Sequence, residues 1–189
     1  MYVIKQDLLT STVEIKKSKF YTYIYKVENQ NQIKEILSKI KEEHKQARHI
    51  LYCYLLENNS MEASENKEPV NSMHKVLDIL TKKQIKNVLC ISVRYFGGIL
   101  LGASNLDKTY SSCIFDLLNE DNLILDVKYY SYKISLKTNY FNVINDIITK
   151  NYGIILKKEF NGPSVNLTFK IPNLPDTLNK YILTIESIN

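Results

Sequence analysis

Apolar and polar side chains alternate along residues 2–27, which is the pattern of strands with one buried face. The apolar positions of residues 31–45 instead recur every three or four residues, and this spacing predicts an amphipathic surface helix. Two runs, residues 49–56 and 87–93, are almost wholly apolar and too short for an exposed helix, so we expect buried strands there. Strands and helices therefore alternate through the first part of the chain.

Helical spacing returns twice more in this part. Residues 73–83 and the stretch from Leu106 to Leu117 each place apolar side chains on one stripe, and we expect the second of these helices to end before Asp121. Residues 57–72 are rich in Asn, Ser and Pro and offer little to bury, so we expect a long polar loop. Loops of this kind often carry functional residues.

A second set of elements follows residue 125. The pattern predicts a strand, a helix, two strands joined by a hairpin turn, and a final helix; these are residues 128–136, 141–149, 154–159, 165–171 and a helix from Asp176 that carries Leu178, Tyr181, Ile182 and Ile185. This order is most of a ferredoxin-like split βαβ unit. We therefore expect two domains, residues 1–125 and 126–189, with the second lacking most of its last strand.

Composition narrows the class of protein. The chain has 189 residues, of which 44% are hydrophobic and 24% charged, as in ordinary globular proteins that bury a core. No run approaches the roughly 18 apolar residues that a membrane-spanning helix needs. Cys53, Cys90 and Cys113 each lie singly in apolar sequence, which favours buried free thiols and a reducing compartment. We expect a cytoplasmic protein without membrane contact.

The net charge of +5 favours nucleic acid as a partner only if the basic residues gather on one face. An AT-rich coding sequence would raise the Lys content in the same way. The two arginines among the 25 basic residues, Arg48 and Arg94, are more informative, because their planar guanidinium groups fit carboxylate or phosphate. Binding of a ligand and pairing with an internal carboxylate are both open for them.

Three of the five glycines, Gly97, Gly98 and Gly102, follow closely after Arg94. A glycine pair after a buried strand permits positive φ angles and lets a ligand or another backbone approach closely. The N–H groups at the start of the next helix could then bind an anion. A tight turn that needs glycine for steric reasons alone explains the same pattern, since the spacing matches neither a P-loop nor a dinucleotide-binding turn.

His49 follows Arg48 at the start of a predicted buried strand, where it could be a general acid or base, a ligand, or a core histidine. His44 and His74 have no partner at metal-ligand spacing, so we expect no metal and no cofactor. Nucleophile elbows, HExxH and paired CxxC motifs are absent, which lowers the expectation of an enzyme. The acidic residues of the predicted loop are expected to form a solvated face rather than a cation site; they are Glu62, Glu65 and Glu68.

A series of short motifs occurs in a characteristic order: Lys17-Ser18-Lys19-Phe20, Ala47-Arg48-His49, Glu68-Pro69, Arg94-Tyr95-Phe96-Gly97-Gly98 and Leu101-Gly102. Together they resemble the YigZ/IMPACT family, and the resemblance covers nearly the whole chain. It implies an α+β fold, with an N-terminal ribosomal-protein-like α/β sandwich domain and a small ferredoxin-like C-terminal domain. It also implies a link to translation, because the eukaryotic relatives act as translational regulators by binding other proteins.

From this resemblance we expect a non-enzymatic, translation-associated protein that binds RNA or a ribosome-associated protein. The expected binding residues are Arg48, His49, Arg94, Tyr95, Phe96, Gly97, Gly98 and Gly102. One alternative is a protein-interaction module that does not bind nucleic acid. The other is an enzyme acting on a small phosphorylated or acidic substrate, with His49 as acid or base, Glu68 as its partner and Arg94 as the anion clamp.

Two stretches depart from the family pattern. Residues 65–74 lack the glycines that relatives carry in the long loop, and Ser104-Asn105 stands where relatives have a glycine pair before a helix. A side chain at these positions restricts close approach of a ligand to the backbone. Any site built from these loops is therefore altered relative to the family.

Overall fold

The computed structural model describes residues 1–188, and the chain divides into two compact units. Unit 1 is Met1–Asp126 and unit 2 is Val127–Asn189. The expected boundary, after residue 125, lies one residue earlier. Both units combine helices with antiparallel sheets, so the predicted α+β fold is confirmed. No helix within residues 1–188 has the length and apolarity that crossing a membrane requires.

Unit 1 is built on a five-stranded sheet in which every neighbouring pair of strands is antiparallel. In spatial order the strands are β2 (Leu8–Ile15), β3 (Ser18–Lys26), β6 (Val88–Tyr95), β4 (His49–Leu55) and β5 (Met61–Ser64). The strands predicted within residues 2–27 and at 49–56 and 87–93 are all present. The short β5 lies inside the predicted polar loop. The polar composition of residues 57–72 gave no indication of a strand.

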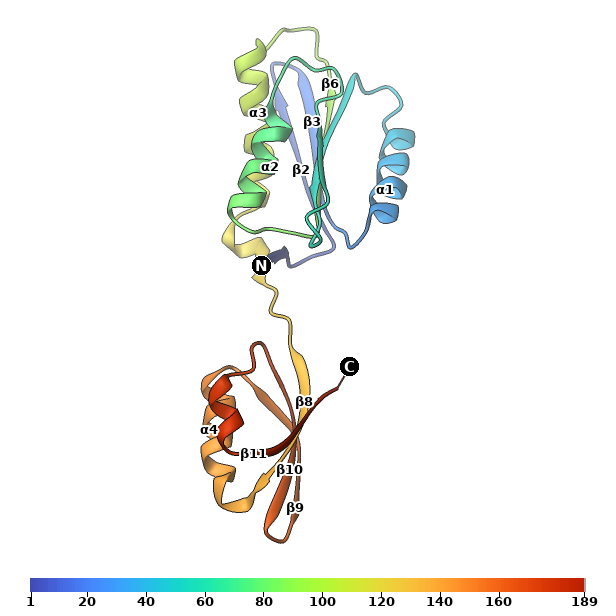
Figure 1. The fold of residues 1–189 in the computed structure, drawn as a ribbon. Coiled ribbons are helices and arrows are strands. Elements are labelled where there is room, and N and C mark those ends of the chain that lie inside the picture. The colour runs from blue at the N-terminus through green and yellow to red at the C-terminus, as the bar shows by residue number, and fades with distance from the viewer. Residues whose placement is uncertain (189) are drawn as a thin grey trace. The chain divides into compact units, whose positions relative to one another are not determined.

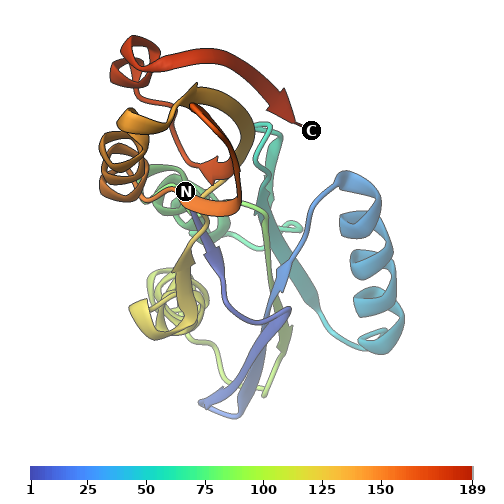
Figure 2. The same ribbon diagram turned by 90° about the horizontal axis from the view of Figure 1, so that it is seen from below.

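Helices cover both faces of this sheet. The helices α2 (Ser72–Lys82) and α3 (Ala103–Leu117) pack on one face, and α1 (Gln30–Glu43) packs on the other (Figures 1 and 2). On β6, Cys90 faces α2 and α3, whereas Leu89 and Ile91 face α1. Because β4 and β6 are central strands buried on both sides, their sequences are almost wholly apolar, apart from Ser92 and the site residues His49 and Arg94.

Unit 1 also contains a separate, two-stranded sheet. The strand β1 (Tyr2–Ile4) pairs antiparallel with β7 (Leu123–Leu125), which follows the 3-10 helix η1 (Glu120–Asn122). Tyr2 also forms a parallel bridge with Ile85. This pairing fastens the start of unit 1 to the segment that leads into unit 2.

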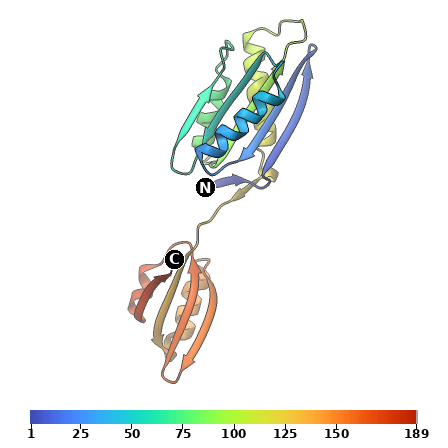
Figure 3. The same cartoon turned by 90° about the vertical axis from the view of Figure 1, so that its right-hand side faces the viewer.

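Unit 2 contains a four-stranded antiparallel sheet with the strand order β11-β8-β10-β9 (Figure 3). In chain order its elements are β8 (Tyr130–Lys137), η2 (Thr138–Tyr140), α4 (Phe141–Lys150), β9 (Ile154–Asn161), β10 (Ser164–Ile171), η3 (Asp176–Lys180) and β11 (Ile182–Ile188). Ile144 and Ile148 of α4 and Leu178 of η3 pack on one face of the sheet. The other face carries mainly polar side chains.

The prediction that unit 2 ends in a helix and lacks most of its last strand was wrong. A 3-10 helix stops at Lys180, and β11 follows as a strand of seven residues that pairs with β8 except at Leu183. The apolar spacing of so short a segment fits a helix and a strand equally well. Ile182, Thr184 and Ile185 are β-branched, which favours a strand, and the open edge of β8 supplies the hydrogen-bonding partner.

Candidate functional site

The predicted binding residues converge at one end of the unit 1 sheet. Arg94, near the end of β6, lies opposite Phe20 of β3 and His49 of β4. The backbone N–H of Arg48 donates to the carbonyl oxygen of Arg94 at 3.1 Å. Gly97 follows β6 and packs against the β2–β3 turn. Three strands and their loops therefore position this group.

Arg94 and Glu68 form an ion pair inside unit 1. The side-chain Nη1 of Arg94 donates to the two carboxylate oxygens of Glu68 at 3.2 and 3.3 Å. Only 5% of Arg94 and 7% of Glu68 is exposed. Because an unpaired buried charge is costly, each of these groups depends on the other. Of the two roles open for Arg94, the structure therefore shows the internal pair with a carboxylate.

Tyr110 of α3 is a second partner of the buried carboxylate. Its hydroxyl donates to Oε2 of Glu68 at 2.9 Å. Burial, and then the charge of Glu68, raise the pKa of Tyr110, so the hydroxyl keeps its proton. The sequence places Tyr110 on the apolar stripe of a helix, and nothing in that stripe distinguishes it from a simple core residue.

His49 links the same carboxylate to the loop that carries it. Its Nε2 lies 3.4 Å from Oε2 of Glu68, and its Nδ1 lies 3.2 Å from the carbonyl oxygen of Asn66. A carbonyl oxygen only accepts, so Nδ1 carries the proton in that contact. Nε2 then interacts favourably with Glu68 only when it is protonated as well. The three residues of the enzyme alternative, His49, Glu68 and Arg94, are thus brought together. The guanidinium group of Arg94, however, is already paired with the carboxylate of Glu68.

The glycines serve the backbone geometry of this end. A Cβ atom at Gly97 would lie 1.9 Å from the carbonyl carbon of Lys17, and the Gly97 N–H donates to the Ser18 hydroxyl at 3.2 Å. Gly98 and Gly102 have φ angles of +84° and +82°, which favour glycine. Steric requirements therefore account for all three glycines of the turn.

Exposed basic residues surround this network. We call the set the basic end: Lys16, Lys17, Lys19, Arg48 and Lys67, all exposed. Arg48 lies over the ring of Phe96, with its guanidinium carbon 5.6 Å from the ring centre, and Arg94 lies 5.5 Å from the same centre. Leu100 is 80% exposed in the loop beyond Phe96. The surface therefore combines positive charge with apolar side chains.

The acidic residues of the 57–72 segment do not form the predicted solvated face. Glu68 is buried, and Oε1 of Glu65 accepts the backbone N–H of Met73 at 2.7 Å, at the start of α2. A carboxylate there satisfies N–H groups that the helix leaves unpaired. Glu62 is exposed and accepts from the Tyr52 hydroxyl at 2.7 Å. Within residues 1–188 no three His, Cys, Asp or Glu side chains are grouped to hold a metal ion.

His44 has partners that the sequence did not reveal. Its two ring nitrogens lie 2.9 Å from the hydroxyls of Tyr23 and Tyr95, which fixes the end of α1 against β3 and β6. Burial lowers the pKa of His44, against a smaller raising effect of Glu43. Since the three residues come from separate elements, no spacing in the chain links them.

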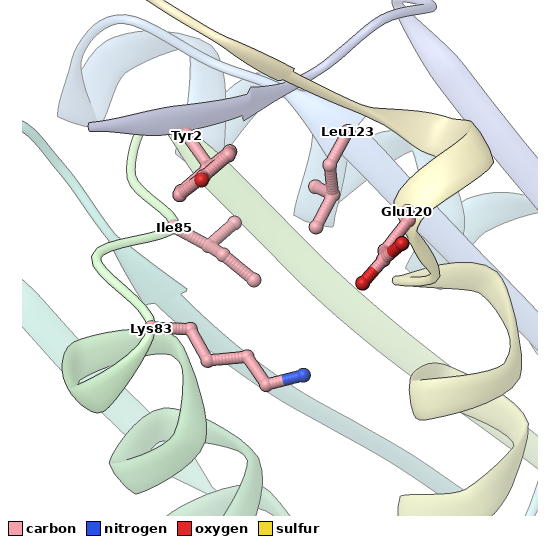
Figure 4. Close-up of a pocket in the computed structure, with 5 residues that line it drawn as sticks. All are labelled: Tyr2, Lys83, Ile85, Glu120 and Leu123. Carbon is pink, nitrogen blue, oxygen red and sulfur yellow. The ribbon is translucent and has the colours of Figure 1, made fainter.

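A surface hollow of about 610 Å³ lies at the opposite end of unit 1 (Figure 4). Its lining consists of Tyr2, Lys83, Ile85, Glu120 and Leu123, none of which is a predicted site residue. The side chains of Lys83 and Glu120 point into it, and both residues are exposed. The hollow is thus separate from the ion-pair network.

Comparison with known proteins gives a consistent result. The family profile of the Impact N-terminal domain matches residues 16–118. The IMPACT family member YvyE of Bacillus subtilis is 30% identical over 115 residues, which are 59% of this chain and 53% of that protein. An IMPACT family member of Haemophilus influenzae is 26% identical over 164 residues, which are 84% of this chain and 80% of that protein.

Two further likenesses extend the comparison. The IMPACT family member YigZ of Escherichia coli is 27% identical over 124 residues, which are 63% of this chain and 61% of that protein. The chain therefore spans about half to four fifths of these three relatives. A crystal structure described as that of a hypothetical protein has a TM-score of 0.61 at 22% identity, covering 90% of this chain and 84% of that one. This last likeness is one of fold.

Proposed function

The chain belongs to the IMPACT family, whose N-terminal domain profile matches more than half of its length, and we propose that it is a non-enzymatic binding protein that acts in translation. We propose further that the basic end of unit 1 contacts RNA, either free or as part of a ribosome. Arg94, Glu68, Tyr110 and His49 support this surface from beneath. Their role in the proposal is to fix the loops that carry the exposed cations.

The proposal rests on one observation: basic residues from separate segments of the chain meet at the basic end. Lys16 and Lys17 form the β2–β3 turn, and Lys19 lies at the start of β3. Arg48 precedes β4, and Lys67 lies in the loop before α2. Glu68, the acidic residue beneath them, is buried and paired. Glu14, exposed opposite Lys19, leaves a surplus of four positive charges. Lys and Arg on one face are the electrostatic footprint of phosphate binding.

The site chemistry also favours binding over catalysis. A substrate phosphate at Arg94 would have to displace Glu68, which accepts from Arg94 and Tyr110. Removing a carboxylate from a buried cation carries a large electrostatic cost. We therefore assign the ligand contacts to the exposed Arg48 and the lysines, and a supporting role to Arg94 and His49.

The test is RNA binding by fluorescence anisotropy at several salt concentrations. We expect the triple variant Lys17→Gln, Lys19→Gln, Arg48→Gln to bind mixed cellular RNA more weakly than the unaltered protein. The slope of log affinity against log salt concentration should be smaller in magnitude by about 2 to 3. Each phosphate contact releases about one counterion, and the variant lacks three of the proposed contacts. Circular dichroism spectra establish that the variant is folded.

A matched control removes the same charge from the other end of unit 1. Lys26 ends β3, and Lys82 and Lys83 lie at the end of α2; all three are exposed. The variant Lys26→Gln, Lys82→Gln, Lys83→Gln should keep both the affinity and the salt slope. If the two triple variants lose the same affinity for RNA, the binding depends on the net charge of the protein and not on the basic end. No binding at low salt would contradict the proposal outright.

One observation favours a protein partner as a second candidate. Phe96, Ile99 and Leu100 are exposed in the loop between β6 and α3, although large apolar side chains gain free energy by burial. A protein with an apolar socket and an acidic rim would cover both the loop and the basic end. Capture of such a partner that survives nuclease and fails in Leu100→Ser would support this candidate over RNA.

A further inference from the structure

The last strand of unit 2 is an apolar edge. The strand order places β11 at the end of the sheet, so its outer backbone edge pairs with no strand in the part of the chain that the structure describes (Figure 3). Leu183, Ile185 and Ile188 are 60%, 41% and 38% exposed. Unpaired N–H and C=O groups beside exposed apolar side chains are a ready template for another strand.

The opposite edge of the same sheet is protected differently. The strand β9 also exposes apolar side chains, but Lys157, Lys158 and Glu159 follow one another in its middle. Its pairing with β10 is irregular just before them, between Ile155 and Lys157. Charged residues and irregular pairing on an edge strand oppose association with another strand. In β11 the single charged residue is Glu186, and the irregular pairing lies at Leu183, before the regular stretch 184–188. Only β11, of these two edges, is therefore suited to pairing.

We propose that β11 pairs antiparallel with β11 of a second copy of this chain, so that two four-stranded sheets join into one. A twofold axis through Ile185 places Ile185 opposite its own copy. Thr184 then lies opposite Glu186 of the second copy, and Leu183 lies opposite Ser187. Identical strands related by a twofold axis form this kind of self-complementary interface.

Side-chain chemistry supports this register. Ile185 lies opposite Ile134 of β8, on the face that packs against α4, so the two Ile185 side chains extend the core across the junction. Opposed β-branched side chains stabilise antiparallel pairs. Glu186 faces a threonine of the other copy, and Lys133 of its own β8 lies opposite it, which offsets its charge. No like charges are placed directly opposite each other.

The test is the mass in solution, measured by sedimentation equilibrium on the full chain from about 1 µM to about 1 mM, the range in which weak interfaces dissociate. We expect the mass to rise with concentration from 22.0 kDa toward about twice that value. Ile185→Lys brings two ammonium groups together at the twofold axis and should stay monomeric. Ile154→Lys, on the β9 edge, should associate as the unaltered protein does.

Disulfide trapping tests the register without depending on a destabilising change. Opposite residues of an antiparallel pair have Cα atoms about 4.5–5.5 Å apart, within the range that a disulfide spans. Under mild oxidation Ile185→Cys should therefore form a covalent dimer, whereas Ile154→Cys should not. A chain that remains at 22.0 kDa throughout, or equal trapping at the two edges, would overturn the proposal.

Discussion

Removing one partner of the Arg94–Glu68 pair should destabilise unit 1 strongly. Arg94→Met leaves the Glu68 carboxylate buried beside Tyr110 and His49, its remaining partners within residues 1–188. Glu68→Gln takes the counter-charge away from the Arg94 cation. Loss of one partner from a buried ion pair costs about 3 to 5 kcal/mol. This is a large part of the 5 to 15 kcal/mol by which whole domains are stable.

The magnitude makes the effect easy to measure. For a unit of this size, 3 kcal/mol corresponds to a fall in Tm of roughly 10 °C. The two units can unfold separately, so unfolding in urea is best followed by NMR, on amide signals from unit 1 alone. A ligand-binding role for Arg94 would instead predict weaker binding with little loss of stability.

The double variant separates pairing from simple loss of a side chain. If the two groups stabilise each other, Arg94→Met together with Glu68→Gln should cost clearly less than the sum of the two single changes. Lys39→Met, which removes one member of an exposed pair with Glu43 on α1, should change stability little. The reasoning is refuted if Arg94→Met unfolds at the same urea concentration as the unaltered protein, or if the two costs simply add.

Three further predictions concern other contacts of unit 1. Gly97→Ala places a Cβ against the backbone of Lys17. It should lower the urea midpoint more than Gly98→Ala, whose Cβ meets open space and which costs about 1 to 2 kcal/mol for the positive φ. Equal effects of the two variants would contradict the close contact at Gly97. The lowered pKa of His44 means that the unfolded chain binds its proton more readily, so stability should fall as the pH drops through 6.5. Between pH 7.5 and 5.5 the Tm of His44→Gln should therefore fall less than the Tm of the unaltered protein. Identical falls in Tm would show that other titratable groups cause the pH dependence of stability in this range. Burial, and then the hydrogen bond to Glu62, raise the pKa of Tyr52 to about 12, so its ultraviolet titration should lie above that of a free tyrosine and move down in Glu62→Gln.

Hydrophobic periodicity predicted most of the fold because most elements bury one side or both. The helix α1 places Ile33, Leu37 and Ile40 on its buried face, and β4 and β6 are apolar runs because helices cover both faces of their sheet. Short elements carry too few residues for a period to emerge. The four residues of β5 were therefore hidden in a polar loop, and β11 could not be told from a helix.

The composition of the site was only partly predictable. Arg94, His49 and Glu68 were singled out by residue type and by motif, and the structure brings them together. Burial, however, depends on tertiary packing, so the sequence could not show that Glu68 lies inside the protein beside Arg94. Tyr110 and His44 were missed for a related reason, since their polar contacts cross between elements distant in the chain.

The most direct test of the proposed function maps RNA onto the surface of the protein. Single-stranded RNA would be titrated into the ¹⁵N-labelled full chain, and amide shifts would be followed residue by residue. We predict that the largest changes fall at residues 16–19, 48, 67 and 96–100, with little change at residues 26 and 82–86. Changes confined to the second group, or none at low salt, would contradict the assignment of RNA binding to the basic end.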